Sequence, residues 1–299
     1  MRTISIPRSA SLVRPRPRGP RLRRFGHAAF VYALLLLLCA FILLPVGWML
    51  TAALKPDTAP IFTFPPEFFP TQFFNWDTFS GVLFNPDTPY FRYSLNTAFL
   101  VFVNIVFAVI SNSLIAYPFA RLRFRGRNIL FAVLIATMLL PAPVLLIPQF
   151  LLFYNIGWYD TYLPLTIPTL AGNAFFVFLL RQYMRTIPKD LDEAARIDGA
   201  GFWTIYWRII LPLTAPALTV VAVFTFLGVW NDFFGPLIYL SNTDLYTVAV
   251  ALANQRSVVG VKWNELMAAN LIAIVPPLAV YFFAQKKLLG GIASVGLKG

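Results

Sequence analysis

The sequence has very little cysteine or histidine: its 299 residues include one of each, Cys39 and His27. A single cysteine cannot form a disulfide within the chain, and a single histidine cannot supply a histidine-rich metal site or a His-Glu-x-x-His motif. A Ser/His/Asp triad would have to use His27, which lies at the end of an arginine-rich tail. The phosphate-binding pattern G-x-x-x-x-G-K-[ST] is also missing, so ATP binding through a P-loop is excluded. We therefore predict no catalytic site, no metal site and no cofactor on this chain.

Charged residues are also scarce. They make up 12% of the chain, whereas a soluble domain carries about 25%. Hydrophobic residues make up 59%, and the mean hydropathy is +0.71. Yet the net charge is +12, and a basic soluble nucleic-acid binder would carry such charge on a hydrophilic body. This composition excludes a soluble enzyme and an ordinary DNA-binding domain, and it predicts an integral membrane protein with no nucleic-acid partner.

Charge-free apolar runs mark the predicted spans, because a helix needs about 20 apolar residues to cross the hydrocarbon core. Six runs qualify: residues 28–54, 93–120, 128–159, 161–180, 209–231 and 266–285. Pro141, Pro143 and Pro148 predict a break in the third run, since proline removes a helical hydrogen bond. The expected fold is an all-α integral membrane protein with six transmembrane helices.

The first run follows an arginine-rich segment, as the core of a secretory signal does. Signal cores span only about 7–15 residues, however, and this run is nearly twice as long. Leu38 also stands before Cys39, where a lipoprotein cleavage site needs a small residue. We interpret residues 27–54 as a retained helix, with a disordered cytoplasmic tail at 1–26 near anionic membrane lipids and an external loop at 55–92.

The distribution of lysine and arginine predicts which side of the membrane each loop occupies. With the N-terminus inside, cytoplasmic segments hold 20 of the 24 basic residues. The opposite orientation would reverse this five-to-one bias. The predicted topology is therefore N-in and C-in, in the cell membrane of a prokaryote.

The cytoplasmic loop at 185–212 has the pattern of a short helix that ends at a glycine. Pro188 is a favourable first helical residue, and Asp190, Asp192 and Glu193 follow in the first turns, where the helix dipole favours carboxylates. Gly199 can adopt the left-handed conformation that ends many helices.

One face of this predicted helix is apolar, because Leu191, Ala194 and Ala195 have the spacing i, i+3, i+4. Its small residues suit close docking against another protein. An amphipathic helix lying on the lipid surface is the alternative. The acidic first turn favours docking, since interfacial helices usually carry a basic polar face.

The same loop resembles the EAA motif of ABC importer permeases, written EAA-x3-G-x9-I-x-L-P. Every fixed position is matched, by Glu193, Ala194, Ala195, Gly199, Ile209, Leu211 and Pro212. The segments RFRGRN, LLIPQF and WNDFFGPLIYL are similar to the carbohydrate permeases of the maltose-importer type. The arginine-rich extension before His27 is longer than that branch leads us to expect.

The resemblance implies a type I ABC importer permease fold, with a transmembrane domain at 91–286 and a cytoplasmic tail at 287–299. It implies that the loop docks on a separate ATPase subunit, which binds the ATP. Glu193, Arg196 and Asp198 would then supply polar contacts, while Ala194, Ala195 and Gly199 permit close approach. The implied partners are two ATPase subunits, a second permease chain and an external solute-binding protein that delivers a sugar.

Polar residues in or beside the apolar runs are the candidates for the solute pathway. Asn231 ends the fifth run and Asp232 follows it, and an acid at membrane depth is a functional candidate. Asn104 lies inside the second run, as Asn96 and Asn112 do. Hydrogen bonding between helices is the first interpretation of such asparagines, and solute contact is the alternative.

Two other functions remain open on the residues alone. One is a permease of the same family for glycerol phosphate, amino acids or peptides. The other is a secondary transporter that works alone. A proton-coupled carrier would ordinarily place acids or histidines in mid-span, and these spans contain almost none.

Overall fold

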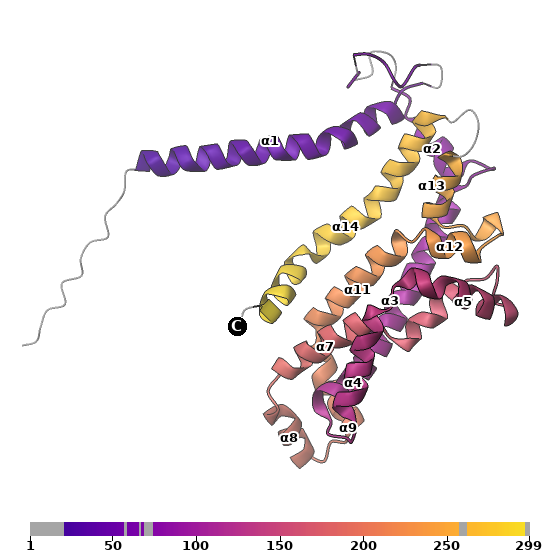
Figure 1. Cartoon of the computed structure of the whole chain (residues 1–299). Helices are drawn as coiled ribbons and strands as arrows, with labels where there is room; N and C mark the ends of the chain where they lie inside the picture. Colours follow the sequence, from indigo (N-terminus) through magenta and orange to yellow (C-terminus); the bar gives the residue numbers. More distant parts are fainter. Residues whose placement is uncertain (1–20, 57–58, 66, 69–73, 257–261, 297–299) are drawn as a thin grey trace, which may run out of the picture. The chain divides into compact units, whose positions relative to one another are not determined.

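The computed structural model describes residues 21–56, 59–65, 67–68, 74–256 and 262–296, and within these ranges all regular structure is helical. The chain forms two compact units, Met1–Trp48 and Met49–Gly299. Most of α1 (Arg21–Ala53) belongs to the first unit (Figure 1). Its candidate span, Gly26–Ala53, exposes apolar side chains over most of its length, and only its last residues, Thr51, Ala52 and Ala53, are buried. At 1.5 Å per residue it is about 42 Å long, enough to cross a bilayer.

The second unit contains the other helices. In chain order they are α2 (Asp77–Phe84), α3 (Tyr90–Arg121), α4 (Arg127–Ala136), the 3₁₀ turn η1 (Thr137–Leu139), α5 (Ala142–Asn155), α6 (Leu163–Thr166), η2 (Ile167–Ala171), α7 (Ala174–Thr186), α8 (Asp190–Ile197), α9 (Phe202–Ile205), the π turn η3 (Tyr206–Ile210), α10 (Leu211–Leu213), α11 (Ala215–Trp230), α12 (Phe234–Tyr239), η4 (Thr243–Leu245), α13 (Val248–Arg256) and α14 (Trp263–Gly296).

Among the described residues, four helical segments are long and apolar enough to span a membrane without a sharp bend: Gly26–Ala53, Tyr90–Arg121, Leu163–Thr186 and Trp263–Gln285. Two further pairs qualify when joined, Arg127–Leu139 with Pro143–Asn155 and Phe202–Leu213 with Ala215–Trp230. Counting each pair as one span gives the six predicted. The two helices of the first pair are bent by 99° relative to each other at the break around Pro141, where the prolines predicted a break. The two helices of the second pair are bent by 73° just after Pro212.

The helix boundaries differ in places from the predicted segments. Helix α1 begins at Arg21, inside the predicted tail, while residues 1–20 lie outside the described part of the chain. Helix α2 occupies part of the predicted external loop, and α14 continues to Gly296.

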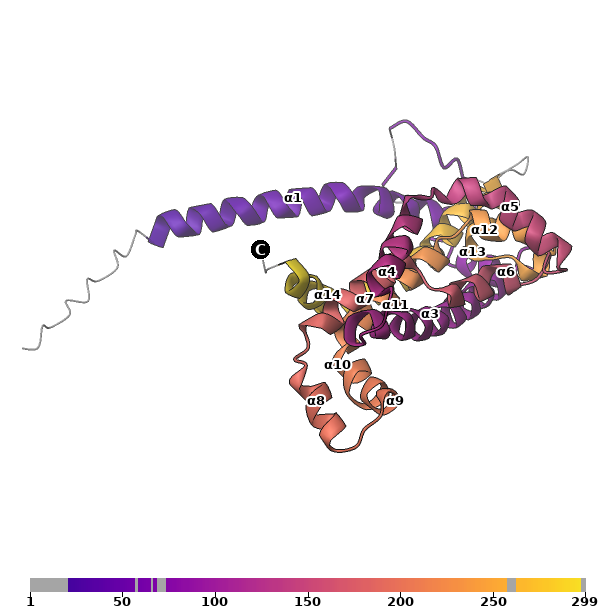
Figure 2. The same ribbon diagram turned by 60° about the horizontal axis from the view of Figure 1, so that its bottom comes forward.

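Helix α3 is the centre of the second unit, where it packs against α7 and α11 (Figures 1 and 2). Small buried residues bring these backbones together, as is usual in membrane bundles. They are Ala108, Ala116 and Ala120 of α3 and Ala217 of α11.

The fourth span is interrupted at Gly172, which has a left-handed φ of +82°. Asn173 then caps α7, since its side-chain oxygen accepts hydrogen bonds from two backbone N–H groups of the first turn. The backbone N–H of Asn173 donates to Oδ1 of Asn112 on α3, over 2.7 Å. A break at membrane depth is tolerated because neighbouring side chains satisfy the freed backbone groups.

Two more polar side chains of α3 serve the same interrupted segment. Asn104 donates to the carbonyl of Leu165 over 3.0 Å, and Ser111 donates to the carbonyl of Thr169 over 3.2 Å. Asn96 similarly donates to backbone carbonyls near η4. These asparagines therefore bond between segments, as the first interpretation of the sequence held.

Candidate functional site: the coupling segment

Helix α8 lies at one end of the second unit, with α9, and α2, α12 and α13 lie at the other end (Figures 1 and 2). It begins at Asp190, two residues after the start expected at Pro188, and Lys189 is its N-cap residue. The three acids of its first turn lie where the dipole favours them, and Arg196 lies in the last turn.

A Schellman motif ends α8. Gly199 has φ +83°, and its N–H donates to the carbonyl of Arg196 over 3.0 Å. The N–H of Ala200 donates to the carbonyl of Ala195 over 2.8 Å. This pair of bonds defines the motif, and the left-handed residue in it is usually glycine.

The structure divides the apolar face that was predicted for α8. Asp192 and Ala195 are its buried residues, whereas Leu191 and Ala194 face outward. Leu191 and Ala194 thus remain accessible on the face for which docking was predicted, whereas Ala195 packs into the apolar cluster of the bundle. Glu193, Arg196 and Asp198 are exposed, and Ile197 is 87% exposed.

The remaining motif residues lie where the chain enters the fifth span. Ile209 belongs to the π turn, and Leu211 and Pro212 form the start of α10. Proline has no N–H to donate and it disfavours continued α-helix, which accounts for a widened turn just before it. Ile209 and Leu211 are half-buried, while Pro212 is exposed beside the bend.

Polar contacts join α3 to this segment. Their α3 residues recur every four positions and so lie on one face. Ser113 Oγ lies 2.8 Å from the hydroxyl of Tyr206, Tyr117 donates to the carbonyl of Phe202 over 3.2 Å, and Arg121 Nε lies 3.7 Å from Asp192 Oδ2. Sequence reasoning had named Asp192 for its place in the first turn, but it missed its partner and the other contacts. The spacing of polar residues in an apolar span was the available signal, but it does not identify the partners.

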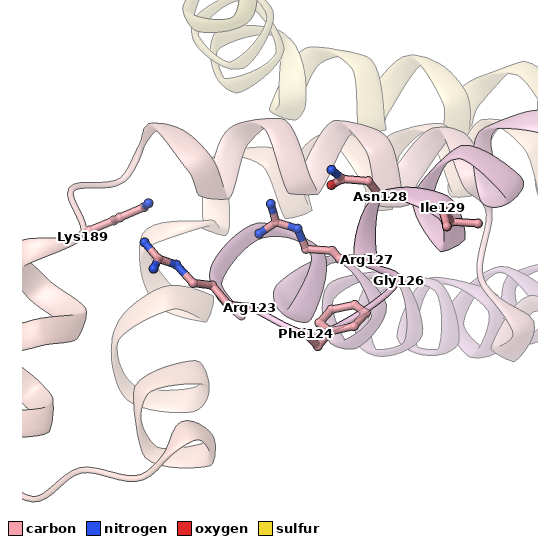
Figure 3. Close-up of a pocket in the computed structure, with 7 residues that line it drawn as sticks. All are labelled: Arg123, Phe124, Gly126, Arg127, Asn128, Ile129 and Lys189. Carbon is pink, nitrogen blue, oxygen red and sulfur yellow. The ribbon is translucent and has the colours of Figure 1, made fainter.

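A basic hollow of about 480 Å³ lies beside the N-terminal end of α8. Arg123 lines it from the α3–α4 connection, Arg127 from the first position of α4, and Lys189 from the α7–α8 connection (Figure 3). No acid is among its lining residues. Two basic loops that the charge distribution assigned to one side of the membrane thus meet at the same end of the bundle.

The three predicted pathway residues lie in different surroundings. Asn104 is buried and bonded within the bundle. Asp232 follows the fifth span, and its Oδ1 accepts a bond from the N–H of Gly235 at the start of α12. Burial raises the pKa of its carboxyl, while backbone hydrogen bonds act in the opposite direction. Asn231 is exposed and lines a hollow of about 360 Å³ between α11, α13 and α14.

Comparison with protein families decides the identity. The family described as the binding-protein-dependent transport system inner membrane component matches residues 104–292, more than half of the chain. The chain belongs to this family. It is thus the membrane permease of a binding-protein-dependent ABC importer, and ATP hydrolysis belongs to a separate subunit. The predicted all-α fold and multi-pass membrane location are confirmed.

The permease is similar to curated transport proteins over most of its length. It is 29% identical to the arabinooligosaccharide permease AraQ of Bacillus subtilis, covering 88% of this chain and 93% of that one. It is 31% identical to the sn-glycerol-3-phosphate permease UgpE of Yersinia enterocolitica, covering 90% and 97%. It is 30% identical to the diacetylchitobiose permease NgcG of Streptomyces coelicolor, covering 91% and 88%.

Solved structures share the fold. A chain of a bacterial ABC transporter that imports the acidic polysaccharide alginate matches with a TM-score of 0.78 and 24% identity, covering 91% of the permease and 99% of that chain. A second alginate transporter structure, in complex with a periplasmic protein bound to an alginate pentasaccharide, matches with a TM-score of 0.61 and 18% identity.

Proposed function

We propose that this permease passes a sugar or oligosaccharide, delivered by an external binding protein, into the cytoplasm. Two of the similar curated permeases carry saccharides by name, and the solved transporters import a polysaccharide. The chain would work with two ATPase subunits and a second permease chain. ATP would be bound by the ATPase subunits, so this chain needs no cofactor of its own.

The exposed face of α8 is the observation that carries the coupling role. Leu191 and Ile197 stay exposed in an amphipathic helix that lies at the end of the bundle, outside the candidate spans. Exposed apolar side chains beside Glu193 and Arg196 suit a protein partner, because apolar contact and charge pairing combine at such surfaces. We assign this face to the ATPase subunit, with Gly199 allowing close approach.

Motion would pass from the ATPase to the spans through this segment. Closure of the ATPase subunits on ATP would displace α8, and the bundle would change from inward-facing to outward-facing. Rigid elements with two packed arrangements are the usual means of such a switch. The basic residues around α8 support a cytoplasmic location for it, and with it the N-in, C-in topology.

Asn231 is the pathway candidate that the geometry favours. Its side chain borders a hollow that Trp230 and Asn270 also line, so an aromatic residue and two amides meet there. Amide groups can hydrogen-bond sugar hydroxyls. Asn104 and Asp232 serve the bundle by hydrogen bonding, so we give them a supporting place in the pathway.

Uptake by cells that carry or lack the chain tests the proposal. Labelled arabinooligosaccharides, diacetylchitobiose and sn-glycerol-3-phosphate form the first panel. We expect deletion to abolish saccharide uptake and the wild-type chain to restore it, while Gly199→Trp fails to restore it despite normal membrane insertion. Normal uptake with Gly199→Trp would contradict the coupling role.

Glycerol phosphate is the alternative substrate, because the UgpE relative is similar over nearly its whole length. Uptake of sn-glycerol-3-phosphate alone would select it. Mild purification of the tagged chain should also recover an ATPase subunit and a second permease. A homogeneous chain that transports solute alone would refute the importer assignment.

A further inference from the structure

Two opposite charges are buried where α3 meets α8. Arg121 is the last residue of α3, and its side chain is 1% exposed. Asp192 lies in the first turn of α8, and its side chain is 8% exposed. Charges removed from water are costly unless they are paired, so each group requires the other.

The pair is not fully formed in this conformation. The distance from Arg121 Nε to Asp192 Oδ2 is 3.7 Å, about 0.8 Å longer than a charge-assisted hydrogen bond of about 2.9 Å. Arg121 Nε and Nη2 and Asp192 Oδ1 are buried with no hydrogen-bond partner. A displacement of α8 by less than about 1.5 Å, the rise of one helical residue, would therefore convert a loose ion pair into a hydrogen-bonded one.

This pair is also the contact with a defined geometry between the buried side of α8 and the bundle. Only Asp192 and Ala195 are buried residues of α8. Apolar contact through the methyl group of Ala195 has no preferred direction, whereas an arginine–carboxylate pair holds a defined geometry. Helix α3, in turn, packs against α7 and α11, so a force on its last residue reaches the centre of the bundle.

We propose that Arg121 and Asp192 are positioning residues for energy coupling, through which movement of α8 is transmitted to α3. The inference rests on the proposed function, since it takes α8 to be the helix that the ATPase displaces. The contacts of Ser113 and Tyr117 extend the same face of α3 toward the fifth span. Ser113, Tyr117 and Arg121 thus lie in a row on one face of α3, and Arg121, at the end of that row, pairs with Asp192 of α8.

Hydrogen exchange in the complex purified with its ATPase subunits tests the proposal. Exchange in α8 and in the cytoplasmic half of α3 is compared with and without MgATP and orthovanadate. In the wild-type complex we expect both segments to change. In the double variant R121Q/D192N we expect the response of α8 to persist and the response of α3 to be lost.

The double variant is chosen because removing both buried charges avoids leaving one of them unpaired. R121K keeps the charge, so it should retain the α3 response. The matched control is R125Q/D190N, which removes one exposed charge of each sign, Arg125 from the connection that follows α3 and Asp190 from α8 itself. It should behave as the wild type.

The outcomes separate the two proposals. A nucleotide response of α3 that survives in R121Q/D192N would overturn the role of the pair and leave the proposed function intact. Loss of that response in R125Q/D190N, or in R121K to the same extent as in the neutral pair, would also overturn it. A wild-type complex in which α8 does not respond to nucleotide would refute the proposed function, and this inference with it.

Discussion

The end of α8 offers a prediction whose size can be worked out, because backbone conformation alone decides it. Gly199 has φ +83°, and a Cβ built on it would meet nothing within 4 Å. Gly199→Ala therefore adds no clash within the chain. The cost is that of placing an L-residue in the left-handed region, about 1–2 kcal/mol.

This free-energy cost destabilises the Schellman motif that ends α8. The N–H groups of residues 199 and 200 donate to the carbonyls of Arg196 and Ala195 in the folded cap. A local penalty of about 1–2 kcal/mol raises the open population by a factor of roughly 5–30. Amide exchange in a peptide covering residues 196–202 should accelerate by that factor in G199A, as measured by mass spectrometry.

Gly201 supplies the matched control. It lies two residues away with φ −78°, and its Cβ position is equally open. G201A should exchange at close to the wild-type rate, and G199N should lie between the two, since asparagine tolerates the left-handed region. Equal acceleration in G199A and G201A would refute the reasoning, because it would show that backbone conformation is not the cause.

Three further changes test the bundle and its outer end. Gly172→Ala should lower the thermal stability of the detergent-solubilised protein, because residue 172 has φ +82° and the new Cβ would lie 2.6 Å from the side chain of Ile115 of α3. Gly228→Ala is the control and should not lower the thermal stability, because the space around Gly228 is open. Asn112→Leu should cost about 0.5–1.5 kcal/mol in unfolding free energy by removing the hydrogen bond to the part-buried backbone N–H of Asn173, and an unchanged denaturation midpoint would contradict this role. Arg92→Ala should cost at most about 1 kcal/mol, because the ion pair with Asp244 is exposed, and added salt should shrink the difference from wild type.

Much of the fold could be predicted from the order of residues. Apolar runs predicted six spans because the bilayer demands length and a near absence of charge, and three prolines predicted the bend beside Pro141. The spacing of seven motif residues identified the family and the segment that contains α8. Gly199 was predicted as its end because few other residues adopt the required conformation.

The break at Gly172 could not be predicted, because residues 161–180 read as one apolar run. Its tolerance depends on Asn112, which lies 61 positions before Asn173 in the chain. A sequence shows that a buried amide needs a partner, but it does not show which distant backbone group fills that role. The same limit explains why the sequence did not show that Asp192 and Ala195 are the buried residues of α8.

The sequence by itself therefore determined the membrane location, the number of spans, the charge asymmetry across them and the family, since each rests on local composition or on spacing along the chain. Only the tertiary structure decided which side of α8 faces the bundle and which residues join it to α3. Arg121 and Asp192 are separated by 71 positions and lie on different helices, and their burial together follows from how those helices pack. Packing is a property of the whole bundle, so the pairing of these two charges appears only when all of its helices are in place.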